Sequence, residues 1–300
     1  MNRKPGVGSS NWFEEVTCIF CGNSETEAFD SGTYHLNLLP PLSVVRCKQC
    51  DLLYMSPRPS ATIRNEMAHG KLPPTLEPYD HQPPNYVPAS MSRAALFEKR
   101  WQWFETFLHP GTFVLDIGCS SGIFLEIGKR KGYQTFGIEI DVEGLKRNLR
   151  NQQRVVQAFA EEIPFSEASF HLVHAHHVFE HLADPLKAAR EVFRILRPGG
   201  FLFIEVPNQF GNIMFIRDRI FHRVPQRKRS IRSIHHLYFF TRKTLVKLVA
   251  HAGFNVCVLQ DNYSWPIPKN WRGFFSLGTR IIGSWIGGGD RLKLLARKPE

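Results

Sequence analysis

One strand–turn–helix–strand pattern near the middle of the sequence constrains the fold most tightly. The apolar run at residues 113–117 predicts a buried strand, and it leads into a turn that carries Gly118 and Gly122. A helical pattern follows, and then a second strand that ends at Glu139. Glycines let the backbone of such a turn approach a ligand closely, and the helix N-terminus behind them favours polar or anionic groups. The pattern predicts an α/β nucleotide-binding sheet.

The position of Glu139 indicates which part of a nucleotide it contacts. It lies 21 residues after Gly118, where an acidic side chain at the tip of the second strand can accept hydrogen bonds from both ribose hydroxyls. The dinucleotide fingerprint G-x-G-x-x-G is absent, because the glycines are spaced G-x-x-x-G with Ser120 between them. A nicotinamide-dependent enzyme is therefore disfavoured.

Residues 114–122 read VLDIGCSSG, which resembles the first motif of class I S-adenosylmethionine-dependent methyltransferases, V-L-D-I-G-C-G-x-G, with Ser120 at its middle glycine. Further stretches resemble the same family in the correct order. They are residues 160–173 (third strand, adenine-side turn and fourth strand), 178–208 (next helix and fifth strand), 236–254 (helix before the sixth strand) and 290–299 (last strand). The resemblance covers residues 92–299. It implies a Rossmann-like methyltransferase fold, a seven-stranded, mostly parallel sheet with helices on both faces.

The resemblance also implies S-adenosylmethionine as cofactor and an enzyme that transfers its methyl group. The residues that it assigns to the methionine part are Asp116, Gly118, Cys119 and Gly122. Those that it assigns to the ribose and the adenine are Glu139, Ile140, Ala160 and Glu161. A non-catalytic, cofactor-binding scaffold stays open as an alternative, because a fold does not guarantee an activity.

The stretch HAHHVFEH, residues 174–181, lies where such a fold places its acceptor site. His174 and His176 alternate within the fourth strand, and His177 stands at its carboxyl end. Active sites of open α/β sheets lie just outside those ends. We therefore expect the methyl group to be delivered near residues 177–181.

Four side chains there are the candidates for catalysis. A hydroxyl acceptor must lose a proton, and neutral histidine is the natural base near pH 7. We predict that the base and acceptor-positioning groups are His177, Glu180, His181 and His236. Two alternatives stay open: a metal held by these residues with His235, and packing or helix capping. The spacing also matches the H-x-x-E-H protease signature, but the setting after a strand of a nucleotide-binding fold disfavours it.

Two C-x2-C pairs stand near the start of the chain, 25 residues apart: Cys18 with Cys21, and Cys47 with Cys50. A two-residue gap lets both thiolates of a pair turn toward one ion, and two pairs complete a tetrahedron. We predict a structural Zn²⁺ without a catalytic role, since four sulfur ligands close its coordination sphere.

These features divide the chain into three predicted parts. Residues 1–56 form a zinc-ribbon module, residues 57–90 a proline-rich linker with little regular structure, and residues 91–300 the methyltransferase domain. The domain carries a basic insert at residues 209–235 and an amphipathic helix at residues 270–287. A front ribbon before this catalytic half resembles a bacterial subgroup that tailors sugars, polysaccharides or natural products.

The net charge of +11 predicts an acidic partner. Arginines of the basic insert suit phosphate, so the preferred substrate is an anionic small molecule or glycolipid, such as a phosphorylated, nucleotide-linked or lipid-linked sugar that is methylated on a hydroxyl. An RNA methyltransferase is the alternative, disfavoured because few aromatic residues interleave with the basic run.

We predict that the protein is located in the cytoplasm. No apolar run follows the basic first residues, and no stretch approaches the length of a membrane span. The aromatic stripe at residues 271–287 predicts a helix pressed on the core, or alternatively a peripheral membrane contact. The sequence makes no prediction of oligomeric state.

Overall fold

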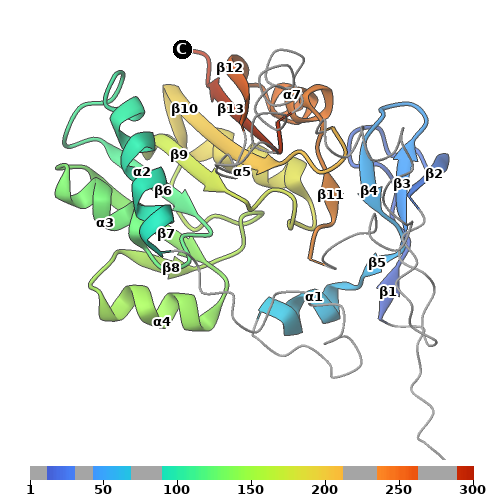
Figure 1. Ribbon diagram of the computed structural model, residues 1–300, viewed down its shortest axis with the longest axis horizontal. Helices are drawn as coiled ribbons and strands as arrows, with labels where there is room; N and C mark the ends of the chain where they lie inside the picture. Colours follow the sequence, from blue (N-terminus) through green and yellow to red (C-terminus); the bar gives the residue numbers. More distant parts are fainter. Residues whose placement is uncertain (1–11, 31–42, 69–89, 212–234, 263–288) are drawn as a thin grey trace, which may run out of the picture.

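A seven-stranded sheet forms the centre of the computed structural model, which describes residues 12–30, 43–68, 90–211, 235–262 and 289–300 (Figure 1). The strands are β6 (Phe113–Ile117), β7 (Gln134–Glu139), β8 (Val155–Gln157), β9 (Phe170–His176), β10 (Leu196–Pro207), β12 (Asn255–Asn262) and β13 (Arg291–Arg297). Their order is β12-β13-β10-β9-β6-β7-β8. Only the pairs that involve β13 are antiparallel. The chain reverses its direction of travel across the sheet at β6, so the carboxyl ends of β6 and β9 flank a topological switch point. The predicted fold class is confirmed.

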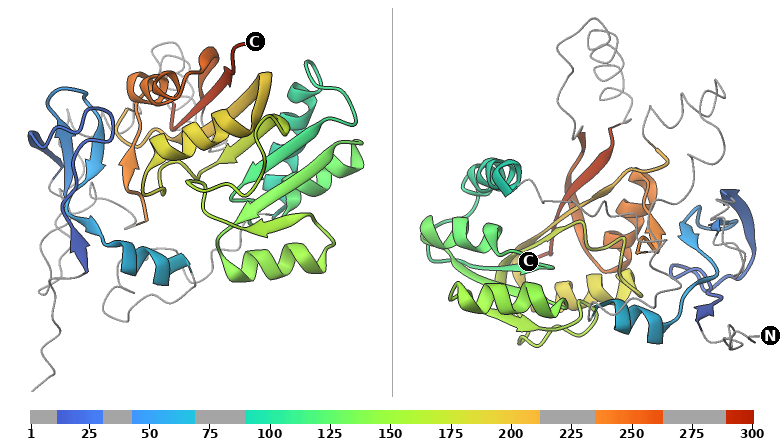
Figure 2. Two further views of the ribbon diagram at one scale, coloured as in Figure 1. Left: turned by 180° about the vertical axis from the view of Figure 1, so that it is seen from behind. Right: turned by 60° about the horizontal axis from the view of Figure 1, so that its bottom comes forward.

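Helices cover both faces of this sheet. They are α2 (Ser90–Phe104), α3 (Ile123–Arg130), α4 (Val142–Arg150), α5 (Pro185–Ile195) and α7 (Arg242–His251). In Figure 1, α2 and α3 lie in front of the sheet, and Figure 2 shows α5 and α7 on the opposite face. Side chains alternate along each strand. Val114 and Leu172 therefore pack with the α2 face, whereas Leu115 and Val173 pack with the α5 face.

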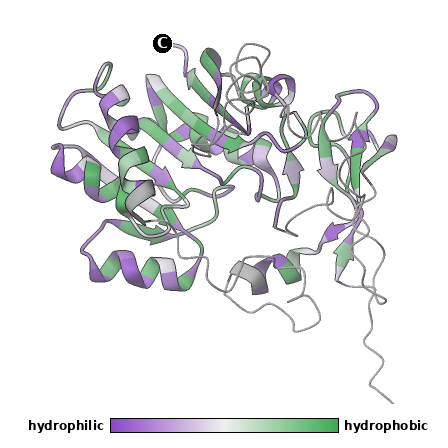
Figure 3. Ribbon diagram, in the orientation of Figure 1, coloured by the Kyte–Doolittle hydropathy of each residue, from purple (hydrophilic) through white to green (hydrophobic). Residues whose placement is uncertain are grey.

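The helices begin where the sequence supplies caps. Asp184 accepts hydrogen bonds from the first turn of α5, and Pro185 follows at the first helical position. Asp141 caps α4 through Gly144 N, and Thr241 forms a capping box at α7. Apolar residues concentrate in the strands, whereas α4 is largely hydrophilic (Figure 3). These signals explain the helix starts without tertiary contacts.

The cysteine-bearing part of the chain forms a second sheet together with a strand from the later half of the chain. Its strands are β2 (Thr26–Asp30), β3 (Val44–Cys47) and β4 (Leu53–Met55), and the fourth strand, β11 (Tyr238–Phe239), comes from far along the chain. The order is β11-β4-β3-β2, and Met55 N donates to Leu237 O at 2.9 Å. Tyr54 and Cys47 lie in the same buried core as Leu248 of α7. The cysteine-bearing part is therefore joined to the half that contains the seven-stranded sheet by both hydrogen bonds and apolar packing.

Residues 58–68 depart from the prediction of an irregular linker. They form β5 (Arg58–Pro59), which pairs with β1 (Phe13–Glu14), and α1 (Ala61–Ala68). Proline disrupts a helix mainly in its interior, and Pro59 precedes this helix. Arg64 of α1 also binds Glu14 at 2.7 Å. The remainder of the predicted linker up to residue 89 lies outside the described residues.

Two segments of the catalytic half also differ from expectation. The third strand is β8, at Val155–Gln157, upstream of the stretch 160–173 that we assigned to it. Its two valines follow a polar run, and a three-residue edge strand leaves little pattern in a sequence. Tyr238 and Phe239, expected within a helical stretch, form β11 because β4 offers them an edge to pair with.

Candidate active site

The turn after β6 holds its backbone in conformations that suit close approach to a ligand. Gly118 has φ +68° and Gly122 has φ +74°, both in the left-handed region. A β-carbon on Gly118 would come within 2.7 Å of Val178 Cγ2, and one on Gly122 within 2.0 Å of Asn148 Oδ1. Asn148 Nδ2 also donates to Ser120 O at 2.6 Å, which fixes the middle of the turn. Both glycines are therefore required by geometry.

Glu139, at the tip of β7, is held against the same turn. One carboxylate oxygen accepts from Ser120 N at 2.7 Å, and the other accepts from Ile140 N at 2.8 Å and Asp141 N at 2.9 Å. Ser120, at the position of the motif's middle glycine, adopts φ +48°. A carboxylate offers about four acceptor positions, so Glu139 has room for one further hydroxyl donor. The side chain is preorganised by backbone donors on both sides.

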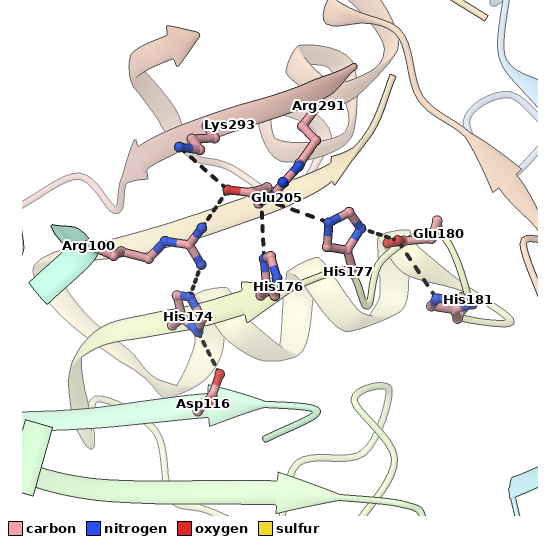
Figure 4. A network of polar contacts seen from close by, with 10 residues as sticks. All are labelled: Arg100, Asp116, His174, His176, His177, Glu180, His181, Glu205, Arg291 and Lys293. Atoms are coloured by element: carbon pink, nitrogen blue, oxygen red, sulfur yellow. Dashed lines mark hydrogen bonds and ion pairs between the residues drawn. The ribbon is translucent and has the colours of Figure 1, made fainter. Parts of the chain in front are cut away.

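Asp116 and His174 begin a buried polar network that crosses four strands, β6, β9, β10 and β13 (Figure 4). His174 Nδ1 lies 2.6 Å from Asp116 Oδ1, and its Nε2 lies 2.7 Å from Arg100 Nη1. Arginine can only donate, so Nε2 accepts and the neutral ring donates from Nδ1 to Asp116. Burial raises the pKa of Asp116 and lowers the pKa of His174. His174 is thus a buried structural link between the β6 motif and α2.

Arg100 continues this network to Glu205 of β10. Arg100 Nη2 lies 2.5 Å from Glu205 Oε2, and Arg291 Nη1 lies 2.8 Å from Oε1. Lys293 Nζ at 3.8 Å and His176 Nδ1 at 3.4 Å complete the surroundings of the carboxylate. Burial acts to raise the pKa of Glu205, but the charges of Arg100, His176 and Lys293 outweigh it and lower the pKa to about 2. Glu205 is therefore ionised and gathers cations from three elements.

His177 leaves the carboxyl end of β9 and meets Glu180. His177 Nδ1 lies 3.1 Å from Glu180 Oε1, and the residue adopts φ +55°. Its side chain is 32% exposed, whereas that of Glu180 is 2% exposed. Burial acts to raise the pKa of Glu180, but His181 and the hydrogen bond to His177 outweigh it and lower the pKa to about 2. The pair joins a reachable imidazole to a buried, ionised carboxylate.

His181 and His236 lie beside this pair, although they are far apart in the sequence. Their ring centroids are 4.8 Å apart, and His181 Nε2 lies 3.7 Å from Glu180 Oε1. The backbone of Leu237, at 2.7 Å, and that of Tyr238, at 3.1 Å, donate to Glu180 O. Burial lowers the pKa of His236 to about 4, and the nearby His181 adds to this effect. All four predicted catalytic side chains therefore come together.

The four cysteine sulfurs at the front also gather, within 4.8 Å of one another. Cys21 Sγ and Cys47 Sγ are 3.7 Å apart, close to the separation of about 3.8 Å that tetrahedral Zn–S bonds impose. Burial raises the pKa of Cys18, and it raises the pKa of Cys50 to about 11. The donor set fits a structural Zn²⁺, whose binding would replace the thiol protons.

The remaining predicted cofactor residues lie at the same edge of the sheet. Cys119 and Ala160 are buried, and the backbone N–H of Ile140 donates a hydrogen bond to the Glu139 carboxylate. Glu161 Oε1 accepts from Ala183 N at 3.0 Å, so its side chain braces the segment before α5. The contacts of these residues with the cofactor stay predictions.

Sequence reasoning missed Arg100, Glu205, Arg291 and Lys293. One signal was available: Glu205 is an acidic residue inside the apolar run FLFIEVP, where a buried charge needs a partner. Arg100 likewise stands in the aromatic-rich helix α2. The basic insert, except residues 209–211 and 235, and the helix predicted at residues 270–287 lie outside the described residues.

Comparison with known proteins supplies the family. A methyltransferase domain family matches residues 85–259, more than half of the chain. The chain belongs to this methyltransferase family. Both this family and the first motif imply methyl transfer from S-adenosylmethionine.

Relatives of this methyltransferase act on different acceptors. The chain is 27% identical over 155 residues to the ubiquinone biosynthesis O-methyltransferase of Paracidovorax citrulli, a match that covers 42% of the chain and 64% of the relative. It is 37% identical over 108 residues to the ribosomal protein L11 methyltransferase of Ralstonia pickettii, covering 34% of the chain and 35% of the relative. The chain thus spans less than two thirds of these relatives' lengths, and the acceptor does not follow from them.

Solved structures agree on the fold. A chain of the complex between the Haloferax volcanii Trm112 methyltransferase activator and its methyltransferase gives a TM-score of 0.52 at 18% identity, covering 69% of this chain and 94% of that one. A methyltransferase structure from Bacillus halodurans gives a TM-score of 0.50 at 18% identity, covering 70% of this chain and 100% of that one.

Among the described helices, none has the length and apolar character that a membrane crossing requires.

The residues of the β6 turn fit S-adenosylmethionine. Its ribose could donate to the remaining acceptor position of Glu139, and its methionine part could lie along the backbone of the turn that Gly118 and Gly122 shape with their positive φ angles. When bound, this cofactor supplies an electrophilic methyl group on a sulfonium. The methyltransferase's own side chains must then orient the acceptor and remove its proton.

Proposed function

We propose that this methyltransferase methylates a hydroxyl group of a small anionic acceptor, with His177 as general base. The observation that carries the proposal is the His177–Glu180 pair at the carboxyl end of β9, across the switch point from the glycine turn. The acceptor oxygen takes the methyl group as the carbon–sulfur bond breaks, and the hydroxyl proton passes to His177.

The orientation of His177 supports this role. If Nδ1–H donates to ionised Glu180, the lone pair of the neutral ring stands on Nε2. Glu180 then fixes the tautomer and stabilises the imidazolium that forms, as the carboxylate of a catalytic triad does. A base placed in this way typically contributes about 10²–10⁴-fold to the rate. His181 and His236, beside Glu180, are placed to position the acceptor.

The anionic character of the acceptor rests on β13. Lys293 is paired in register with Glu205, and Arg291 with Pro207, so both lie at the carboxyl end of β10. Their side chains are 23% and 21% exposed. Arg291 and Lys293 bring two positive charges to the single carboxylate of Glu205, which favours a phosphate or carboxylate on the acceptor. A phosphorylated, nucleotide-linked or lipid-linked sugar has the required combination of hydroxyl and negative charge.

Labelled methyl groups would test the acceptor class. Purified protein, S-adenosylmethionine labelled on its methyl group and a bacterial extract would be incubated and separated into water-soluble, lipid, protein and nucleic-acid fractions. We expect base-stable label, as an ether gives, in the water-soluble or lipid fraction. Label in RNA or protein would overturn the substrate assignment but not the fold or the cofactor. A His177→Asn variant should transfer far less label, whereas His109→Ala, which changes an exposed histidine away from the site, should transfer label like the wild type.

A further inference from the structure

Glu180, His181 and His236 form a second cluster of metal-ligating side chains, separate from the four cysteines. One carboxylate oxygen and one nitrogen from each imidazole all lie within 4.8 Å of one another. The cluster is assembled by main-chain hydrogen bonds, because Leu237 N and Tyr238 N both donate to Glu180 O. The ligands therefore come from two segments that the backbone holds side by side.

His181 presents a lone pair to Glu180. Its Nδ1 lies 2.8 Å from the carbonyl oxygen of His235, and a carbonyl can only accept, so Nδ1 carries the hydrogen. In the neutral ring, Nε2 is then an acceptor, and it lies 3.7 Å from Glu180 Oε1. Figure 4 shows the ring of His181 directed at this carboxylate. Two acceptors that face each other need a cation or a proton between them.

Glu180 itself lacks a full set of partners. The residue is 1% exposed, and its Oε2 makes no hydrogen bond with the described residues. A buried carboxylate oxygen without a partner is costly. His177 occupies Oε1, so it does not relieve this cost. The carboxylate retains coordinating capacity toward the two imidazoles.

We propose that Glu180, His181 and His236 bind one divalent transition-metal ion of the zinc class. Two imidazoles and one carboxylate are a common ligand set of catalytic zinc sites, which leave a coordination position open. Bonds of that length place tetrahedral ligand atoms about 3.4 Å apart, close to the 3.7 Å between His181 Nε2 and Glu180 Oε1. The hydrogen bond from His181 Nδ1 to a carbonyl is the outer-shell contact that metal-bound histidines usually make.

The neighbouring group His176, His177 and Glu205 is a poorer candidate, although its ligand atoms also lie within 4.8 Å. Arg100 and Arg291 already bind both oxygens of Glu205. Their positive charges would repel a metal ion at that carboxylate. The local charge therefore favours metal binding at Glu180 over metal binding at Glu205.

The open position of the ion would face the acceptor beside His177. Coordination of the acceptor hydroxyl to the ion lowers its pKa, which eases proton transfer to His177. This role rests on the proposed methyl transfer to a hydroxyl. The binding of the ion does not, so the two can be tested separately.

The test measures metal binding by the full chain with its cysteine site loaded with zinc. Equilibrium dialysis against Co²⁺, followed by elemental analysis, should find one zinc and one cobalt per chain. Glu180→Gln and His236→Ala should each weaken cobalt binding by about tenfold or more while the zinc content stays at one. His109→Ala should bind cobalt as the wild type does. The visible bands of bound Co²⁺ should indicate nitrogen and oxygen ligands without thiolate.

The proposal is overturned if the wild-type protein takes up no cobalt beyond its zinc. It is also overturned if both variants, shown to be folded by an unchanged melting temperature, bind cobalt like the wild type. A methyl-transfer assay with and without added Zn²⁺ then tests the role of the ion. Cobalt binding by a protein that methylates no hydroxyl would contradict the proposed function and leave the metal site standing.

Discussion

At the scale of single residues, Gly122 makes the sharpest prediction. Its left-handed φ and the proximity of Asn148 leave no room for a side chain. We expect Gly122→Ala to destabilise the turn by about 1–3 kcal/mol and to weaken S-adenosylhomocysteine binding by about tenfold or more. Titration calorimetry checks the affinity. Gly111→Ala is the matched control, because Gly111 also has a positive φ, of +87°, but open space around it.

His177 carries a second prediction at this scale. We expect His177→Asn to lower kcat by about 10²–10⁴-fold with cofactor affinity unchanged, because a positioned base is lost. Asparagine tolerates the left-handed backbone that His177 adopts, so the fold should survive. Steady-state kinetics on the identified acceptor, with His109→Ala in parallel, provide the measurement. A kcat close to the wild-type value would remove His177 from the proton transfer.

The ionisation of Glu205 should make the free energy of unfolding depend on pH. Its pKa in the folded protein, about 2, lies below the ordinary value of 4.5. A carboxylate with a depressed pKa stabilises the fold above its unfolded pKa, and this stabilisation is lost as the pH falls through the folded value. Glu205→Gln leaves Arg100 buried and unpaired, which should cost about 3–5 kcal/mol near pH 7.

The free energies of unfolding of wild type and Glu205→Gln should therefore converge as the pH falls from about 5 toward 2. Urea titrations at several pH values measure this difference. A gap that stays constant over the range would show that Glu205 does not contribute through its charge.

At the scale of elements, the pairing of β11 with β4 connects the four-cysteine module to the proposed acceptor site. The chain runs from Cys47 and Cys50 into β4, and β4 pairs with β11 from far along the chain. Leu237, next to β11, donates its backbone N–H to Glu180 O. Lys247 of α7 adds a hydrogen bond to Cys50 O at 3.2 Å. The ribbon thus supports the segment that carries His236.

We expect Cys47→Ser to release zinc and to abolish most methyl transfer without touching the cofactor turn. Hydrogen exchange should accelerate at residues 236–240, while S-adenosylhomocysteine still binds. Lys48→Ala, at an exposed position of the same C-x2-C pair, should change neither zinc content nor activity. Unchanged exchange at residues 236–240 after zinc loss would contradict a supporting role for the ribbon.

At the scale of the whole molecule, the cysteine module and the methyltransferase half should unfold together. Cys18, Cys47 and Leu52 share one buried cluster with Leu245 and Leu248. We expect the zinc-loaded protein to unfold in a single transition, in which fluorescence and far-ultraviolet circular dichroism coincide. Two separate transitions would show that the module is an independent domain.

Segments with local signals could be predicted from the sequence. The strand at Phe113–Ile117, the glycine turn and the two cysteine pairs each depend on residues a few positions apart, so spacing alone indicates them. The seven-stranded fold was implied by the methyltransferase family that several stretches resemble in the correct order, and the structure confirms it. The gathering of His177, Glu180 and His181 was also predictable, because they follow one strand end.

Other features were decided by tertiary structure. Arg100 meets Glu205 across 105 positions of the sequence, and β11 pairs with β4 across a longer separation still. No local pattern predicts such contacts. Taken alone, Glu205 is only a charged residue in an apolar run, and Arg100 and β11 lie in stretches with a helical pattern. The sequence by itself determined the glycine turn and the cysteine pairs. Only the packing of the sheet decided which buried charges neutralise each other and that the ribbon supports His236, since both depend on segments that meet after folding.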